Sequence, residues 1–286
     1  MRRLAPVLLT VSLLLGGLAC DPGGACPECA SAEPADCPKP KVKTKVVQAG
    51  PQPAVDNGDI KLTFADPKSA RLKRFKAQLS GSKLFGKVVS GVNDTIALPR
   101  DAAVLVSECG RIDAYYEPKA PGVVICYELA EHFESLFKGR AKGKELERMV
   151  TGAVFFAFFH ELGHALVDQL KLPITGKEED AVDQLAAVIL IESGSGIEMA
   201  LDGGRAFLLN DAKGYSANEF WGEHSFEKQR YYSIVCMAYG AAPKKRAALS
   251  GGKYGLPKER AQGCPAEYAR IKTSWQTLLA EHGKAD

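Results

Sequence analysis

The stretch "FFAFFHELGHALVDQL", residues 155–170, places two histidines and a glutamate inside one of the most apolar runs of the chain. Apolar residues precede and follow this polar group, so the segment predicts a helix that is buried on nearly every side. Buried polar side chains need partners, because burial without them costs free energy. We therefore expect the three polar residues to share a bound ion and hydrogen-bond acceptors from neighbouring elements.

The polar residues form an H-E-x-x-H pattern, with His160 and His164 at its ends and Glu161 inside it. Residues four apart on an α-helix differ by roughly 40° about the axis, so both imidazoles project from one face. They offer two neutral nitrogen ligands to Zn²⁺, and Glu161 lies where it can take a proton from the attacking water. The alternative, two core histidines beside a surface glutamate, leaves buried polar groups without partners.

A third ligand is expected from the next predicted helix, which begins in "GKEEDAVDQLAAVIL", residues 176–190. Glu179 and Asp183 are four apart and share a face. We expect Glu179 to be the third ligand, with Asp180 as the alternative, and Asp183 to accept a hydrogen bond from the far nitrogen of a ligating histidine. A helix dipole explains acidic residues in a first turn, but it does not explain Asp183 among apolar neighbours.

The order His160-Glu161-x-x-His164 and then Glu179-x-x-x-Asp183 resembles the gluzincin metallopeptidases, the thermolysin-like group whose third ligand is a glutamate one helix later. The connection "KLPITGKE" is shorter here than in thermolysin. A longer set of motifs is similar to a bacterial family of metallopeptidases with unassigned substrates, over roughly residues 58–280: "CGRIDAYYEP", "VICYEL", "HELGHAL", "EEDAVDQLA" and "WGEHSFEKQRYYSIVCMAYG". This resemblance implies a zinc peptidase fold and says little about the substrate.

Attack on an amide builds an oxyanion, which needs a hydrogen-bond donor beyond the metal. His224 is the expected donor, because gluzincins use such a downstream histidine, and Tyr231 and Tyr232 are alternatives. A surface histidine at a helix start is the simpler interpretation of His224.

The pattern of elements predicts an α+β fold. Alternation over residues 59–67 predicts a strand, and "RIDAYYEP" with "GVVICYEL" predicts a hairpin. Tyr115 and Tyr116 lie on this hairpin, which is a candidate sheet edge for a substrate strand, although aromatic residues also simply fill strands. Helices are expected over residues 67–81, 83–94, 126–139, 144–170, 178–192, 198–209, 219–239 and 264–283. We therefore expect a small N-terminal strand and hairpin region followed by a mainly helical, zincin-like metallopeptidase domain.

The N-terminus predicts export and a lipid anchor. Residues 1–20, "MRRLAPVLLTVSLLLGGLAC", have two arginines, an apolar run and small residues before Cys20, as in a bacterial lipoprotein signal whose cysteine is acylated. Ordinary cleavage or a retained anchor are the alternatives. Residues 21–57 predict a disordered linker rich in Pro, Ala and Lys, and residues 58–286 the metallopeptidase domain. The expected location is the bacterial cell envelope.

The charge balance and the cysteines indicate which partners and which compartment to expect. The 37 basic and 34 acidic residues nearly balance, which argues against a nucleic-acid partner. An exported chain permits disulfides, and Cys109 and Cys126 flank the predicted hairpin, so they are candidates for one pair. Cys236 and Cys264 would then form another, although connectivity does not follow from sequence alone.

The expected function is a zinc-dependent metallopeptidase that hydrolyses peptide bonds in proteins or peptides in an exported, membrane-tethered setting. The alternatives are a zinc-containing binding or assembly lipoprotein without activity, an amidase acting on cell-wall peptides, and a structural lipoprotein without metal.

Overall fold

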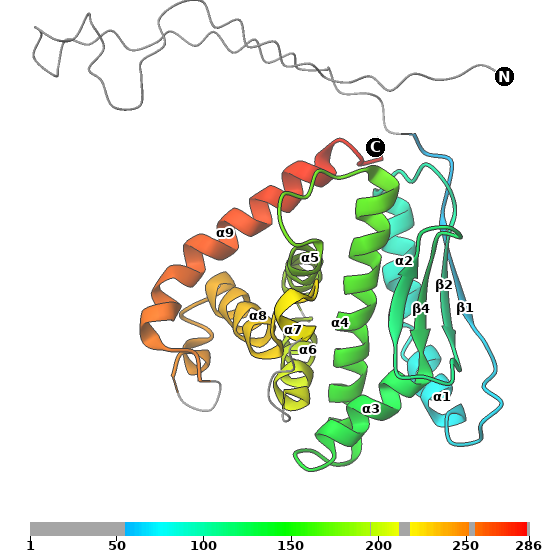
Figure 1. Cartoon of the computed structure of the whole chain (residues 1–286), viewed down its shortest axis with the longest axis horizontal. Coiled ribbons are helices and arrows are strands. Elements are labelled where there is room, and N and C mark those ends of the chain that lie inside the picture. The colour runs from blue at the N-terminus through cyan, green and yellow to red at the C-terminus, as the bar shows by residue number, and fades with distance from the viewer. Residues whose placement is uncertain (1–54, 195, 212–217, 252–254, 285–286) are drawn as a thin grey trace, which may run out of the picture. The chain divides into compact units, whose positions relative to one another are not determined.

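The computed structural model describes residues 55–194, 196–211, 218–251 and 255–284 (Figure 1). The predicted signal, Cys20 and nearly all of the predicted linker lie outside these residues. The strands come first and helices follow, so the predicted α+β class is confirmed. The strands are β1 (Ile60–Phe64), β2 (Ala102–Ser107), β3 (Ala114–Glu117) and β4 (Gly122–Cys126). The helices are α1 (Lys73–Gly81), α2 (Leu84–Thr95), α3 (Tyr127–Phe137), α4 (Gly143–Leu170), α5 (Glu178–Glu192), α6 (Ile197–Asn210), α7 (Asn218–Trp221), α8 (Glu227–Ala241), the 3-10 helix η1 (Ala247–Leu249) and α9 (Lys258–Ala280).

The strands form a mixed sheet in the order β1-β2-β4-β3. Strands β1, β2 and β4 are parallel, whereas β3 pairs antiparallel with β4 and places Tyr116 opposite Val123. The predicted hairpin is therefore present. Within the described residues, β3 is an edge strand, which leaves one row of its backbone groups free to pair with another chain.

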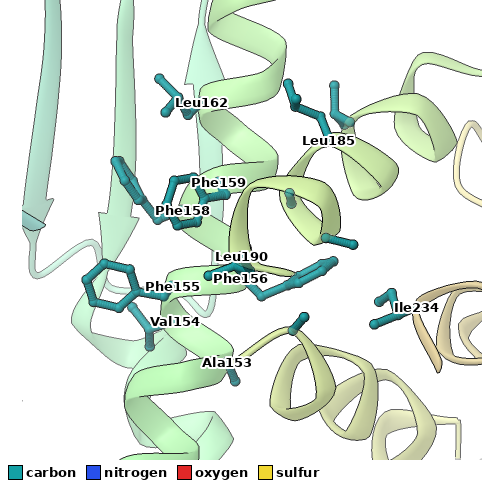
Figure 2. Packing of buried hydrophobic residues seen from close by; sticks show 14 of the residues in the cluster. Ala153, Val154, Phe155, Phe156, Phe158, Phe159, Leu162, Leu185, Leu190 and Ile234 are labelled. Atoms are coloured by element: carbon teal, nitrogen blue, oxygen red, sulfur yellow. The ribbon is translucent and has the colours of Figure 1, made fainter. Parts of the chain in front are cut away.

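Helix α4 is the central element, with β3 and β4 on one side and α5 and α6 on the other (Figure 1). Figure 2 shows that the phenylalanines of α4 pack in both directions. Phe155 and Phe158 point toward the strands, and Phe156 points toward α6. The ring of Phe85 on α2 lies 4.4 Å from Phe155 and 5.0 Å from Phe158, and Phe207 on α6 lies 5.7 Å from Phe156. A helix that packs on all sides must be apolar on all sides, as the sequence indicates.

By length and composition α4 is also the one described helix that could cross a membrane, but 83% of its most apolar window is buried inside the fold. That burial identifies it as a core helix.

Helices α4 and α5 approach each other closely at Gly163. A Cβ atom at this position would lie only 2.8 Å from Cβ of Val182 on α5. The glycine inside the H-E-x-x-H pattern therefore removes a steric obstacle between the two helices, and the first turn of α5 can reach the histidines of α4.

The predicted continuous helix over residues 219–239 is wrong. Helix α7 ends at Trp221 and α8 begins at Glu227, and residues 222–226 are not helical. Gly222 has low helix propensity, and the N–H of Phe226 bonds to the side chain of Gln229, as at a helix start. The amino group of Lys177 donates hydrogen bonds to the carbonyls of Gly222 and His224, which hold the break in place. The last helix also begins earlier than predicted, at Lys258.

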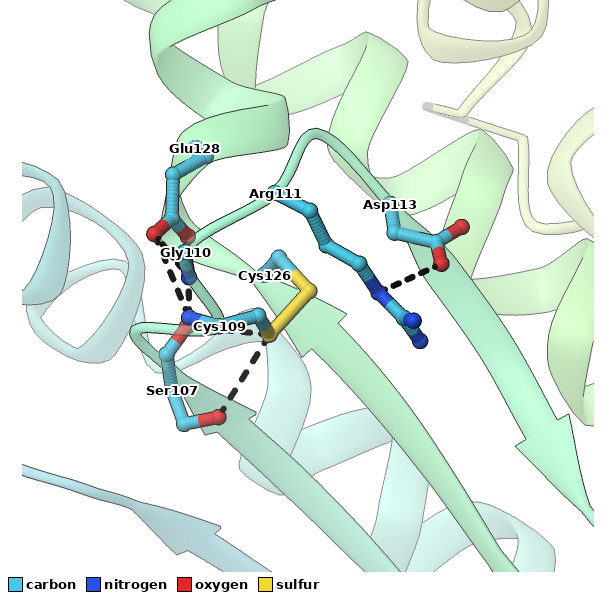
Figure 3. Close-up of a disulfide and its surroundings, with 7 residues drawn as sticks. All are labelled: Ser107, Cys109, Gly110, Arg111, Asp113, Cys126 and Glu128. Carbon is cyan, nitrogen blue, oxygen red and sulfur yellow. Dashed lines mark hydrogen bonds and ion pairs between the residues drawn. A yellow bond between two sulfur atoms is a disulfide. The ribbon is translucent and has the colours of Figure 1, made fainter.

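Both predicted disulfides are present. Cys109–Cys126 ties the chain before β3 to the end of β4, and Cys236–Cys264 ties α8 to α9. Figure 3 shows the first of them, beside Glu128, whose carboxylate accepts hydrogen bonds from the N–H groups of Cys109 and Gly110. Disulfides persist in oxidising compartments, so they indicate a location outside the cytoplasm.

Candidate metal centre

The side chains of His160, His164 and Glu179 converge at the α4–α5 contact. The Nε2 atoms of the two histidines lie 3.3 Å apart. Glu179 Oε2 lies 3.1 Å from Nε2 of His160 and 3.5 Å from Nε2 of His164. Asp180, the alternative ligand, faces elsewhere and accepts a hydrogen bond of 2.8 Å from the Ser225 hydroxyl.

These three atoms fit a divalent metal ion. Ligand atoms about 2.0–2.1 Å from a tetrahedral zinc ion lie about 3.3 Å from one another. Glu179 Oε2 is buried and accepts no hydrogen bond from the described residues, although imidazole nitrogens surround it. Short separations between three such atoms, together with a buried carboxylate oxygen that accepts no hydrogen bond, are typical of ligand atoms that point at a common ion. Two imidazoles and one glutamate are also the donor set of several catalytic zinc sites.

The orientation of the His160 ring is fixed by a contact at Nδ1, the nitrogen that faces away from the cluster. Asp183 Oδ1 lies 2.8 Å from His160 Nδ1, which leaves Nε2 directed at the cluster. The guanidinium of Arg230 on α8 in turn holds Asp183, donating from Nε at 2.6 Å and from Nη2 at 2.8 Å. Its carbon Cζ also lies 3.8 Å from the ring centre of Phe207. All three polar residues in this chain of contacts are buried.

Sequence reasoning missed Arg230 and Glu178. Arg230 is one of many arginines in the sequence, and no local signal marks it as a buried partner of Asp183. Glu178 Oε1 lies 2.7 Å from His164 Nδ1, so it orients the second imidazole as Asp183 orients the first. The helix dipole had explained Glu178 without this role.

Burial and neighbouring charges shift the pKa values of the cluster. Burial opposes ionisation of Asp183, but Arg230 and His160 outweigh it and lower the pKa of Asp183 to about 2. Burial likewise opposes protonation of His160, but the hydrogen bond with Asp183 and the adjacent Glu179 carboxylate raise its pKa to about 9. Burial raises the pKa of Glu161, and the two histidines only partly offset this. A carboxyl with a raised pKa is suited to proton transfer near neutral pH.

His224 reaches the cluster from the non-helical segment between α7 and α8. Its Nε2 lies 2.9 Å from Glu179 Oε2, and its ring is nearly parallel to that of His160 at 6.3 Å. The side chain is 55% exposed, whereas His160 is buried and the His164 side chain is only 16% exposed. Tyr231 and Tyr232, the alternative donors, do not line the cavity described next.

A cavity of about 660 Å³ opens beside the cluster. Its walls include His160, Glu161 and His164 from α4, together with Tyr115 and Tyr116 from the edge strand β3. The Tyr116 hydroxyl donates a hydrogen bond of 2.7 Å to Asp168. The sheet edge, the carboxyl of Glu161 and the candidate ligands thus border one space.

No curated protein and no solved structure matches the chain. A family model matches residues 64–279, a stretch that contains every residue of the cluster and well over half of the chain. The chain thus belongs to the family described as "Putative metallopeptidase", which makes it a metal-dependent hydrolase acting on peptides.

Proposed function

We propose that this metallopeptidase is a zinc enzyme in which His160, His164 and Glu179 hold the ion. The proposal rests above all on the convergence of the two Nε2 atoms and the buried Oε2 atom from two tightly packed helices. Asp183 and Glu178 keep the imidazoles oriented, because each carboxylate bonds the Nδ1 atom that faces away from the cluster.

When bound, zinc acidifies a water molecule and polarises a carbonyl oxygen. Glu161 acts as the general base that takes a proton from the attacking water and then delivers it to the leaving amine nitrogen. Its position supports this role, because it lines the cavity directly beside His160 and His164 and its pKa is raised by burial.

His224 donates a hydrogen bond to the oxyanion that develops on the peptide carbonyl. Its exposed side chain on a non-helical segment and its approach to Glu179 support this role. The substrate pairs with β3 as an added strand, since that edge borders the cavity and presents Tyr115 and Tyr116 to it.

We further propose that residues 58–286 are a catalytic domain tethered by residues 21–57 to a membrane through acylated Cys20. The support is the signal-like sequence before Cys20 and the two disulfides, which fit an exported protein. Mass spectrometry of the protein isolated from membranes should find lipid on Cys20, and a Cys20→Ser variant should be released in soluble form. A Cys20 that is absent or unmodified in the mature chain would contradict the anchor.

The enzyme is tested by elemental analysis of protein purified without a metal-affinity tag, followed by incubation with unstructured casein with and without a chelator. We expect one zinc per chain and cleavage that the chelator abolishes. A folded protein without stoichiometric metal would overturn the zinc proposal and leave a structural lipoprotein. Zinc without any cleavage would indicate a binding or assembly protein, and cleavage of cell-wall peptides alone would indicate an amidase.

A further inference from the structure

A second cavity, of about 250 Å³, lies on the other side of His160 and Glu161. It is lined by α3, α4, α6, α8 and residues 112–114, and it shares Ala114, His160, Glu161 and His224 with the first cavity. The two spaces therefore meet at the general base. A peptide whose scissile carbonyl lies at the candidate metal centre has neighbouring residues within reach of both cavities.

Apolar side chains form one part of the wall of the second cavity, and charged and polar side chains form the rest. Large side chains come from α3, α4 and α6: Leu129, Phe133, Leu136, Phe156 and Phe207. The wall formed by Phe156 is rigid, because this ring packs edge-to-face against Phe207 and lies where any side chain on Gly203 would clash. A rigid apolar wall of this kind favours an occupant that removes a matching apolar surface from water.

Small residues create the space. Ala153 and Ala157 on α4 and Ala206 on α6 line the cavity, and longer side chains at these positions would extend into it.

The charged groups of this cavity disfavour an acidic occupant. Asp113, Glu161 and Glu227 all line it, and Glu227 Oε2 is buried without a hydrogen bond from any described residue. Arg230 and His160, which also line the cavity, both contact the Asp183 carboxylate: Arg230 donates two hydrogen bonds to it, and His160 Nδ1 lies 2.8 Å from Oδ1. A carboxylate entering this space would meet three carboxyl groups, and it would compete with Asp183 for Arg230 and His160.

We propose that this second cavity receives the side chain of a residue next to the scissile bond and selects a large apolar side chain over a small or an acidic one. The inference rests on the proposed peptidase function and names the substrate class for that site. Filling such a cavity with a phenylalanine or leucine side chain in place of alanine is worth about 10- to 100-fold in kcat/KM.

Two opposite variants test the proposal. The cut sites of the enzyme in casein are first mapped by mass spectrometry, and quenched fluorescent peptides are then made with Phe, Ala or Asp next to the bond. The wild type should prefer Phe over Ala by about tenfold or more, and Asp should be the poorest. Ala206→Leu narrows the cavity and should lower the Phe-to-Ala ratio about tenfold, whereas Phe133→Ala widens it and should shift the preference toward Trp.

Leu208→Phe is the matched control, because Leu208 lies on the same helix as Ala206 and does not line the cavity. Its Phe-to-Ala ratio should equal that of the wild type. Circular dichroism and zinc content should show that each variant is folded and loaded. Cut sites without a side-chain preference on either side of the bond, or an unchanged ratio in folded Ala206→Leu, would overturn the proposal.

A binding measurement separates this inference from the proposed catalysis. Peptide hydroxamates that carry a Phe or an Ala side chain bind a metal without being cleaved, and calorimetry gives their affinities. We expect the Phe compound to bind about tenfold tighter to the wild type and this advantage to vanish in Ala206→Leu. Selective binding without any cleavage would refute the peptidase and keep the cavity assignment, and equal binding of both compounds would refute the cavity assignment.

Discussion

The two sides of the candidate site are built in opposite ways. On the α4–α5 side, His160 is buried and hydrogen-bonded to Asp183, and Arg230 in turn donates a hydrogen bond to Asp183. On the other side, His224 is 55% exposed on a non-helical segment that Lys177 holds only through backbone carbonyls. Groups that hold an ion need fixed geometry, which helix packing supplies, whereas a group that contacts a substrate must remain accessible. Substitutions on the α4–α5 side should therefore change stability, zinc affinity or proton transfer, whereas substitutions at His224 should change mainly the rate of cleavage.

The largest effect is expected for Glu161→Gln, which keeps the shape of the buried side but removes the proton acceptor. We expect kcat to fall by about 10³-fold or more, with the zinc content unchanged. Steady-state peptide cleavage and elemental analysis measure the two quantities. Glu223→Gln is the matched control, because Glu223 lines the same cavity without an assigned role. Full activity in a zinc-loaded Glu161→Gln protein would remove Glu161 from the mechanism.

Arg230→Met tests the contribution of the Arg230–Asp183 pair to the stability of the buried side of the site. The change leaves the Asp183 carboxylate buried beside His160 without its cation, which should lower the free energy of unfolding by about 3–5 kcal/mol. Urea unfolding followed by circular dichroism measures this difference. Lys61→Met, on strand β1, breaks an exposed pair with Asp101 and should lower the free energy of unfolding far less. If the two variants lost the same free energy of unfolding, Arg230 would contribute no more to stability than a surface ion pair.

His224→Ala tests the accessible side. We expect kcat to fall by about 100-fold while zinc affinity stays within a fewfold of the wild type, because the proposed role of His224 is to stabilise the oxyanion and not to bind the ion. His224→Gln keeps a hydrogen-bond donor and should recover part of the rate. Zinc affinities come from competition with a chelating dye. A large loss of affinity would instead make His224 a ligand, as its 2.9 Å separation from Glu179 also permits.

Acid should lower the free energy of unfolding of the protein over a defined pH range, through the Asp183 carboxylate. The pKa of Asp183 falls from the usual 3.8 to about 2 in the fold, so its ionised form stabilises the protein above pH 3.8. That contribution, about 2 kcal/mol, is lost as the pH falls from about 4 toward 2. Urea unfolding of the metal-free protein between pH 5 and pH 2 measures the slope. The slope over this interval should flatten in Asp183→Asn, and an identical slope would assign the acid sensitivity to other carboxylates.

The smallest effect is expected for Glu178→Gln, because Glu178 orients His164 from a half-exposed position. An amide oxygen can still accept the hydrogen bond from Nδ1, so zinc affinity should fall by only about tenfold. The same dye competition measures it. Glu223→Gln again serves as the control for a lost surface charge, and an equal change in both variants would reduce the role of Glu178 to general electrostatics.

Local patterns predicted much of the framework. The bounds of α5 were predicted correctly, and those of α4 to within one residue, because an unbroken apolar run and an acidic first turn mark a buried helix. The hairpin also followed from strand patterns, and the two candidate cysteine pairs are present, although the sequence alone did not establish their connectivity. The break at residues 222–226 was missed, since it depends on Lys177 and on the Ser225–Asp180 contact, which join segments distant in the sequence.

The sequence by itself determined that His160 and His164 share one face of a buried helix, because the helical repeat fixes the direction of residues four apart. Only the tertiary structure decided that Glu179 rather than Asp180 faces them, that Arg230 lies behind Asp183, and that a second cavity opens beside Glu161. These features depend on how closely α4, α5, α6 and α8 approach and how each is rotated about its axis. Packing around Gly163 and Val182 sets that arrangement, and no local repeat encodes it.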